Sequence, residues 1–454
     1  MGSRTRSPDA FERDVERTMA CFDRAEFRDL LVEMIEVPSP TGDEAPLALV
    51  LAQRLADFGL DARVQPLDDR QANAVGHLRS SVTDGPELLL YAPIDTHLAG
   101  DEAVDLPQAG ERLTELQRNH ATVRGWEIAG LGAENPKGFA ACVITAARCI
   151  AASGIKLRGD LLVGLGAGGM PTNPPLGSCR RNIGHGAGVT FMLQQGLRPD
   201  YAVIAKPEWG VSWEEVGVTW FRVRVRGALG YAGIRHVLPY RNPVLGAAAV
   251  VRELEAWFPE YAAAHSSGLV APQGVVGAIE GGFTHKPTFV PATCDLYLDM
   301  RVSPRDDPRD VRRELEAQLE AIRARERDLD CDVEMLLAIP GSHTPPGTWV
   351  VQSLIRAWEA MEQRPHQAPA NASGATDVAI LRMWGIPTAR LGVPHDAVGR
   401  EGPWAGVDDL PMNMVHVDDC ARLVEALVRV ALDTCGRSRA EIVEAGTSAK
   451  ETKS

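Results

Sequence analysis

The sequence predicts an α/β fold: a mainly parallel sheet with helices on both faces, plus an inserted α+β domain of two layers. Two observations lead to this prediction. Over most of the chain, short apolar runs typical of buried strands alternate with amphipathic stretches of helical period. In a central segment the strands instead alternate apolar and polar residues, as strands with one solvent-exposed face do.

The apolar runs of the first kind are candidates for buried parallel strands. They cover residues 87–92, 160–165 and 201–205. Parallel neighbours need a long crossover between them, usually a helix. Helical patterns supply such crossovers at 137–152 and 185–195, and further helices are predicted at 350–361, 376–384 and 420–432.

The central segment has the order strand, helix, strand, strand, helix, strand, which suits a small antiparallel sheet with helices on one face. Its alternating strands are 219–226 and 294–301, and its helices are 242–258 and 308–325. We therefore expect one inserted domain at 217–334 and one discontinuous domain at 9–216 and 335–435. The polar, small-residue ends at 1–8 and 436–454 are expected to be disordered.

Composition narrows the class of protein. A chain of 454 residues is long enough for two domains, and 45% apolar with 24% charged residues is typical of a globular protein. The net charge of −14 argues against a nucleic-acid partner. No apolar run approaches the roughly 18 residues of a membrane span. The eight cysteines form no CxxC pair and no leader segment precedes them, so we expect reduced thiols and a cytoplasmic location.

Nine different short motifs follow one another in a characteristic order between Arg28 and Leu432. They are LVEMIEVPSPTGDE at 31–44, LLLYAPIDT at 88–96, GAENPKG at 132–138, DYAVIAKP at 200–207, RNPV at 241–244, DMR at 299–301, SGATD at 373–377, GIPT at 385–388 and VHVDD at 415–419. Together they resemble the zinc-dependent superfamily of aminoacylases, acetylornithine deacetylases, succinyl-diaminopimelate desuccinylases and glutamate carboxypeptidases. The resemblance implies that the inserted domain is a lid that also mediates dimerisation.

The same resemblance implies a site for two zinc ions, held by histidines and carboxylates. In this sequence the corresponding positions hold other residues: Pro93, Asn135, Gly169–Met170 and Lys206, with Asp409 in place of the last histidine. Of these, only Asp409 carries a side chain suited to zinc. We therefore expect no metal and no other cofactor.

Lys206 suggests what replaces the metal. A fixed ammonium group in the vacated site, near Asp95 and Asp409, would substitute a cation of the chain for a bound one, although such a buried pair needs good geometry. The alternative is that Lys206 points to solvent.

The groups that the resemblance assigns to substrate binding are better kept. Asn242 and Arg301 correspond to residues that grip a substrate carboxylate, a role that suits the planar fork of arginine, and Gly374 lies in a loop of the same pocket. The lid histidine is replaced by either Tyr231 or His236.

Three functions remain open. The first is a metal-independent enzyme that binds a small, carboxylate-bearing, amino-acid-like ligand. Side-chain acid–base chemistry by Lys206, Asp95, His97, Tyr231 or His236 would then serve C–N hydrolysis, elimination, cyclisation or acyl transfer. The second is a protein without catalysis, either a small-molecule binder or a scaffold for a partner. The third is a zinc hydrolase with substitute ligands such as Asp95, His97 and Asp409.

Two structural expectations complete the prediction. The chain is expected to form a homodimer, with Thr219–Arg226 pairing with its twin at a sheet edge. The resemblance also implies a cis peptide after the bridging position, which here is the bond between Asn135 and Pro136.

Overall fold

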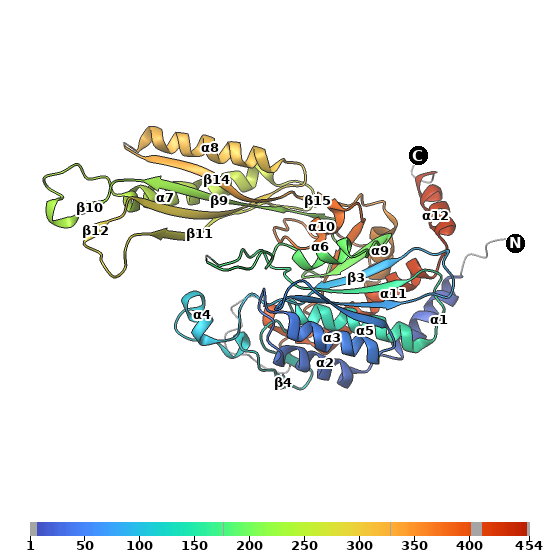
Figure 1. Ribbon diagram of the computed structural model, residues 1–454. Coiled ribbons are helices and arrows are strands. Elements are labelled where there is room, and N and C mark those ends of the chain that lie inside the picture. The colour runs from blue at the N-terminus through green and yellow to red at the C-terminus, as the bar shows by residue number, and fades with distance from the viewer. Residues whose placement is uncertain (1–6, 176, 327, 401–410, 452–454) are drawn as a thin grey trace. The chain divides into compact units, whose positions relative to one another are not determined.

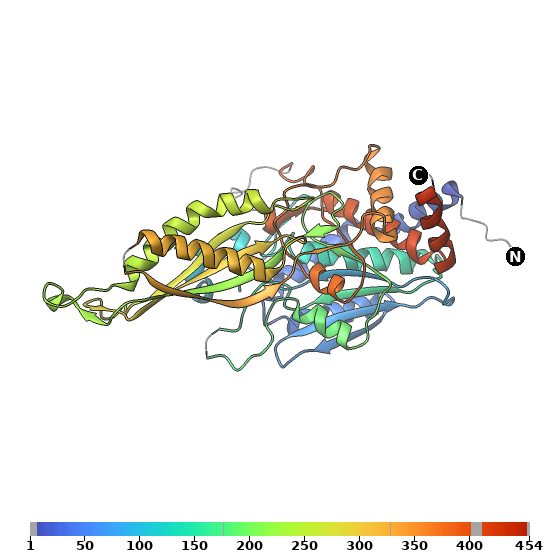
Figure 2. The ribbon, with the colours of Figure 1, turned by 90° about the horizontal axis from the view of Figure 1, so that it is seen from above.

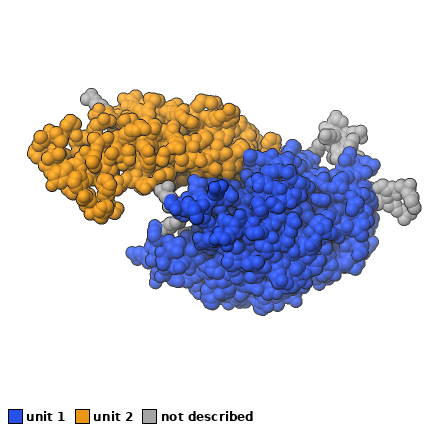
Figure 3. All heavy atoms as spheres, viewed as in Figure 1, with its two compact units in different colours: residues 1–213, 344–368, 376–454 blue, residues 214–343, 369–375 orange. Residues whose placement is uncertain are grey.

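The computed structural model describes residues 7–175, 177–326, 328–400 and 411–451. It divides into two compact units (Figure 3). Unit 1 comprises residues 1–213, 344–368 and 376–454, and unit 2 comprises 214–343 and 369–375. The inserted domain was predicted at 217–334, and the division between the units lies a few residues outside both of these ends.

Unit 1 is built on a sheet of six strands in the order β1-β2-β6-β3-β7-β16. The strands β6, β3, β7 and β16 are parallel, whereas β2 and β1 pair antiparallel at one side. This is the mainly parallel sheet that the sequence predicts. The bounds are β1 (Asp61–Pro66), β2 (Ala72–Leu78), β3 (Leu88–Pro93), β6 (Leu161–Gly166), β7 (Tyr201–Ala205) and β16 (Thr388–Leu391).

Helices cover both faces of this sheet (Figure 1). Alternate residues of β3 show why: Leu88 and Leu90 belong to one core cluster, and Leu89 and Tyr91 belong to another. The larger cluster contains side chains of α2 (Arg24–Glu36), α3 (Ala45–Asp57), α5 (Lys137–Ser153), α9 (Trp349–Glu362) and α11 (Val417–Cys435). The smaller contains side chains of α6 (Ala187–Gln194) and α10 (Val378–Met383).

The remaining elements of unit 1 lie around this core. A second sheet has the order β17-β5-β4, with bounds Met414–His416, Glu127–Ala129 and Thr122–Arg124. The other helices are α1 (Pro8–Met19), α4 (Glu102–Ala109) and α12 (Arg439–Glu451). None of the described helices is both long and apolar enough to cross a membrane.

The expectation of disordered chain ends is contradicted at the C-terminal one. The prediction was wrong for the C-terminal end, because residues 439–451 form α12, whose first turn is held by hydrogen bonds between Ser438 and Glu441. A helical pattern with alanine and glutamate was hidden there by the small and polar composition. At the N-terminal end, Ser7 caps α1 and Pro8 opens it, while residues 1–6 lie outside the described part.

Unit 2 is a four-stranded antiparallel sheet in the order β11-β13-β9-β14. Helices α7 (Pro243–His265) and α8 (Pro308–Arg325) lie side by side on one face (Figures 1 and 2). The predicted order of strands and helices is confirmed. The strands are β9 (Gly217–Arg226), β11 (Gly274–Gly281), β13 (Thr293–Val302) and β14 (Asp330–Ile339), with short pairs β8–β15 (Glu214–Glu215, Ser342–His343) and β10–β12 (Gly230–Tyr231, Phe289–Val290).

The alternation in β9 follows from its two faces. Phe221, Val223 and Val225 are buried under the helices. On the opposite face Arg222 pairs with Glu334, and Arg224 forms two hydrogen bonds of 2.8 and 2.6 Å with Asp295. The predicted edge pairing of this strand is wrong, because β9 lies between β13 and β14 and has both sides occupied.

Candidate functional site

The predicted site residues of unit 1 follow strands whose carboxyl ends lie at one edge of the sheet. Asp95 comes just after β3, Gly169 just after β6, and Lys206 directly after β7. Because these strands are parallel neighbours, the segments that follow them meet at this edge, where open α/β sheets place their ligand sites.

Asp95 is fully buried and its carboxylate accepts three hydrogen bonds. Thr41 donates through Oγ1 at 2.8 Å, and the backbone amides of Gly169 and Met170 donate at 2.8 and 2.9 Å. The carboxylate is therefore held by neutral donors, which stabilise its charge without a cation. Asp95 thus fixes the loop that carries Gly169 and Met170, two of the positions that the resemblance assigns to metal ligands.

A third vacated position, Pro93, packs directly against this loop. A Cβ placed on Gly169 would lie 2.5 Å from the Cβ of Pro93, and 3.1 Å from carboxylate oxygens of Asp95 and Asp377. Real Cβ atoms do not approach so closely, so a side chain at position 169 would displace its surroundings. Pro93 and Gly169 therefore pack against each other in a way that leaves no room for a carboxylate side chain at position 169.

Lys206 is buried rather than turned to solvent, with 7% of its surface exposed. Its Nζ donates a hydrogen bond of 2.8 Å to Oδ1 of Asn135, which is itself only 8% exposed. Two positions that the resemblance assigns to carboxylates are thus joined by an ammonium and a neutral amide. The predicted partner Asp409 lies outside the described residues. The bond between Asn135 and Pro136 is cis, as predicted.

Two further acids lie close to Asp95. Tyr91, which is completely buried, donates a hydrogen bond to Asp377. Glu44 is also completely buried, and Oε1 accepts from the amides of Gly42 and Gly168 at 2.9 and 2.8 Å. Burial, together with the charge of Asp95, raises the pKa of Glu44 to about 8. Glu44 is therefore mostly protonated at neutral pH.

Sequence reasoning missed a histidine–carboxylate pair beside Asn135. His395 lies in the loop after β16, and its Nε2 is 2.8 Å from Oε2 of Glu134, which is 2% exposed. The hydrogen bond that His395 donates to the Glu134 carboxylate raises the pKa of His395. The sequence did contain a hint of Glu134, because this residue directly precedes Asn135, the position that the resemblance assigns to the bridging ligand. Nothing in the sequence linked it to a histidine 261 residues away.

The other predicted site residues are partly or fully exposed. His97 follows Asp95 but faces solvent. In unit 2, Tyr231 is 46% exposed and stacks on Phe289, and His236 is exposed. Gly374 is exposed as well.

The two residues predicted to grip a carboxylate have partners within unit 2. Arg301 binds the carboxylate of Asp299 through Nε and a terminal nitrogen, at 2.9 and 3.0 Å. Asn242 caps α7 by accepting from the amide of Val244, and it donates to the hydroxyl of Tyr240 at 2.9 Å. An incoming carboxylate would compete with Asp299 for the guanidinium of Arg301.

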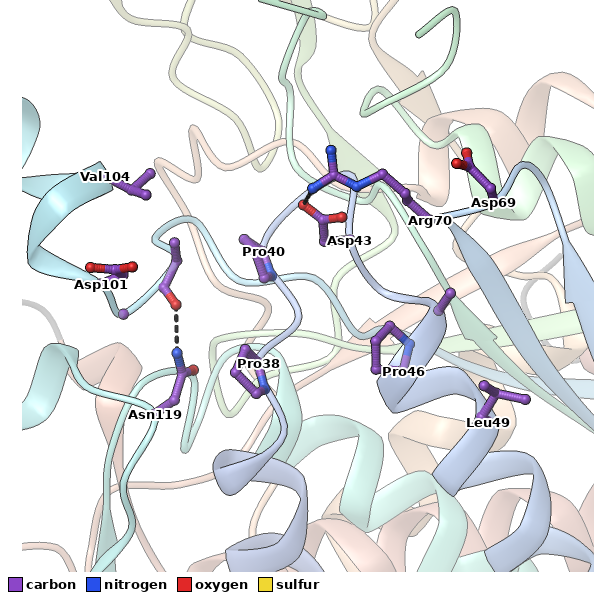
Figure 4. Close-up of a pocket in the computed structure, with 13 residues that line it drawn as sticks. Pro38, Pro40, Asp43, Pro46, Leu49, Asp69, Arg70, Asp101, Val104 and Asn119 are labelled. Carbon is purple, nitrogen blue, oxygen red and sulfur yellow. Dashed lines mark hydrogen bonds and ion pairs between the residues drawn. The ribbon is translucent and has the colours of Figure 1, made fainter.

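A pocket of about 770 Å³ is lined by Pro38, Pro40 and Asp43, which lie in the segment before α3 (Figure 4). Its walls are largely apolar, and the rings of Pro38, Pro40 and Pro46 form part of them. The guanidinium of Arg70 pairs with Asp43 at its rim. Since Pro40 forms a β-bridge with Thr96, this wall is joined to the strand end that carries Asp95.

The described residues at the positions that the resemblance assigns to zinc ligands do not suit zinc. Proline and glycine offer no donor, methionine is a poor ligand for this ion, and an ammonium repels it. The described residues contain no group of three or more histidine, cysteine, aspartate or glutamate side chains placed to hold a metal. These positions therefore carry a hydrogen-bonded network of protein groups.

Comparison with known proteins agrees with this fold. Residues 214–326 match the family model described as a peptidase dimerisation domain, of M20 type. Aminopeptidase PepT from Bacillus cereus superposes with a TM-score of 0.61 at 17% identity, covering 90% of this chain and 98% of its own. The fold is that of the M20 peptidases.

Two other solved structures of this fold match over a similar length. Human carnosine dipeptidase 1 superposes with a TM-score of 0.67 at 14% identity, covering 94% of this chain and 99% of its own. An M20 metallo-carboxypeptidase from Sulfolobus solfataricus superposes with a TM-score of 0.63 at 14% identity. The match covers 90% of this chain and 98% of the carboxypeptidase. The predicted resemblance to the zinc aminoacylase and peptidase superfamily is confirmed at the level of the fold.

Proposed function

We propose that this chain is a metal-independent member of the M20 fold that binds a small, carboxylate-bearing, amino-acid-like ligand. The observation that supports the proposal best is the hydrogen bond between Lys206 and Asn135. This bond orients the Lys206 side chain at the carboxyl end of β7. A lysine at the ligand-binding edge of an α/β sheet is a group that can bind an anionic part of a ligand.

The metal part of the proposal is tested by elemental analysis of the purified protein. We expect far less than one equivalent of zinc, and ligand binding that survives treatment with a chelator. The control is the double variant Lys206→Glu/Asn135→Asp, which restores two acids but leaves Pro93 and Gly169 in place, so it should still hold little zinc. About two equivalents of zinc in the native protein, with binding lost on chelation, would refute metal independence.

The ligand part is tested by calorimetry with N-acetyl amino acids and dipeptides as probes. Lys206→Met, which keeps the length of the side chain and removes its charge, should weaken binding of the best probe at least about tenfold. A matched control is Lys156→Met, since Lys156 lies outside the site in the loop after α5. Equal affinity of the Lys206→Met and native proteins would remove Lys206 from the ligand site.

Catalysis is a second candidate function, and the pair of His395 and Glu134 favours it. The buried carboxylate of Glu134 fixes the ring of His395 through Nε2, while 39% of the His395 side chain remains exposed. A fixed and accessible imidazole is the arrangement that general bases use. In C–N hydrolysis it would take a proton from water as the oxygen adds to the carbonyl carbon. It would return that proton to the nitrogen as the C–N bond breaks.

This candidate predicts a separation of binding from turnover. His395→Gln should lower kcat on a hydrolysed probe by about a hundredfold or more, and leave probe affinity nearly unchanged. Glu134→Gln should lower kcat less, because it removes only the orienting charge. If no probe of this class is turned over by the native protein, the chain is a binder rather than an enzyme.

A further inference from the structure

The segment between β6 and α6 encloses a second, chemically different pocket in unit 1. It has a volume of about 520 Å³. The segment leaves the sheet at Met170 and is closed at its base, where the amides of His185 and Gly186 donate to the carbonyls of Met170 and Gly168 at 3.0 and 2.9 Å. A Cβ on Gly184 would lie 2.2 Å from the Met170 carbonyl oxygen, so glycine is needed for this closure.

The lining of this pocket suits an anion. None of its thirteen described lining residues is acidic, although the chain as a whole carries a net charge of −14. Arg181 contributes a positive charge at the rim, where it is exposed and forms no ion pair with any described carboxylate. The amide of Asn173 adds a fixed polar group, because its Oδ1 is held by Nε2 of His185 at 3.0 Å.

The remaining lining is partly polar, with Thr172, Asn182, Thr190 and Gln194, and partly apolar. Leu67, Ile183 and Phe191 contribute side chains to the same pocket, and Phe191 comes from the exposed side of α6. A ligand that fills this space therefore needs an apolar body as well as a charged end. A bare inorganic anion would leave this part of the surface uncovered.

We propose that this pocket is a binding site for a small organic oxyanion, a carboxylate or a phosphate monoester carried on an apolar or aromatic body. Arg181 binds the oxyanion, since its fork donates two parallel hydrogen bonds to either group. The body lies against Phe191 and Ile183. The site is separate from the one proposed at Lys206, and occupation of the two sites is independent.

The experiment is calorimetric titration of the full-length protein with benzoate, phenyl phosphate, inorganic phosphate and benzylamine. We expect saturable binding of benzoate or phenyl phosphate, and the stronger of the two identifies the kind of oxyanion. Inorganic phosphate should bind at least about tenfold more weakly, because it lacks the apolar body. Benzylamine, which has the same body with the opposite charge, should not bind.

Variants locate the binding. Arg181→Gln should lower affinity at least about tenfold, whereas Arg63→Gln, which removes an exposed arginine on β1, should change it little. Lys206→Met should leave the affinity for the aromatic anion unchanged. Failure of this pocket proposal is therefore distinguishable from failure of the function proposed at Lys206. Native affinity in Arg181→Gln, or no binding of either aromatic anion at millimolar concentration, would overturn the proposal.

Discussion

Single hydrogen bonds hold two charged side chains at the carboxyl edge of the main sheet. Asp95 is stabilised by one hydroxyl and two backbone amides, and Lys206 by the neutral amide of Asn135. Each contact is a hydrogen bond between a charged and a neutral group, which contributes about 1.5 to 3 kcal/mol when it is well formed. The edge of the sheet is therefore held together by the chain itself.

Glu44 makes the stability of unit 1 depend on pH. Below the ordinary pKa of 4.5 both the folded and the unfolded states carry the proton. Between 4.5 and about 8 only the folded state keeps it, so the free energy of unfolding should fall as pH rises through this window and level off above it. The slope is at most about 1.4 kcal/mol per pH unit.

Glu44→Gln should remove this slope, because a glutamine amide can accept the bonds from Gly42 and Gly168 without titrating. Urea unfolding of the native and variant proteins at pH 5, 6.5 and 8 measures the difference. Glu111→Gln, at an exposed position, is the control and should keep the native slope. Parallel pH profiles of the Glu44→Gln and native proteins would contradict the assignment.

Gly169 allows a direct test of the packing at the vacated metal positions. Gly169→Ala should destabilise the protein by about 1 to 3 kcal/mol, because the new Cβ meets Pro93 at 2.5 Å and two carboxylates at 3.1 Å. Gly374→Ala is the matched control, since a Cβ there has nothing within 4 Å. Thermal unfolding compares them, and equal melting temperatures would mean that the loop at 169 yields easily.

Residue-level prediction from sequence reached some of these contacts and not others. The motif around Asn135 and the end of β7 at Lys206 located two residues that turn out to be bonded, because the resemblance assigns both motifs to one site. The pair of Glu134 and His395 could not be found in this way. Its members lie in loops, and loop conformation depends on contacts that no periodic pattern encodes.

At the scale of elements, strands and helices were predicted well where apolar periodicity is strong. The position of β9 within its sheet was not predicted correctly. An alternating pattern of apolar and polar residues shows which face of a strand is buried. A central strand and an edge strand of a sheet with one polar face have the same pattern, so the pattern does not distinguish them. The arginines of β9 pair with acids on both neighbouring strands, which sequence alone could not reveal.

The edges of this sheet are β11 and β14, and their chemistry differs. β11 carries two exposed apolar side chains, Val275 and Ile279, whose exposed fractions are 47% and 58%. β14 carries Asp330, Asp332 and Glu334, charges of the kind that discourage edge pairing. If unit 2 mediates a homodimer, as the name of its matched domain suggests, we expect the contact on the side of β11.

Ile279→Lys should therefore convert the dimer to a monomer, since it places a charge on an apolar edge. Leu336→Lys introduces the same change on β14, where the side chain is 37% exposed, and should leave the dimer intact. Light scattering coupled to size-exclusion chromatography measures both masses. Dissociation by Leu336→Lys alone would move the interface to the other edge.

At the scale of the whole molecule, unit 2 is inserted through two adjacent strands. Glu214 and Glu215 of β8 pair with His343 and Ser342 of β15, so the long segment of unit 2, residues 214–343, begins and ends at neighbouring points. The short segment 369–375 is a separate part of the same unit. Each unit also has its own core of buried residues. Such an insertion can be removed without cutting through a core.

Replacing residues 216–341 by Asn-Gly should close β8 and β15 into a hairpin and leave unit 1 folded. We expect the shortened chain to unfold in one cooperative transition and to retain the circular dichroism of an α/β protein. A chain of the same length whose deletion instead removes α5 and the segments around it should not fold, because α5 belongs to the core of unit 1. Loss of structure in the first chain would show that unit 1 depends on unit 2.

The insertion also affects the order in which the protein can fold during synthesis. Strand β16 and helix α11, which pack against β7 and α5, leave the ribosome only after residues 214–343 have been made. The early half of unit 1 must therefore wait with apolar surface uncovered, while unit 2 already has nearly all of its chain. Nascent chains arrested just after Ala375 should contain a protease-resistant unit 2 and a degradable N-terminal half. Early protection of residues 7–213 instead would mean that this half folds without its last strand, and cellular chaperones would then have little to cover.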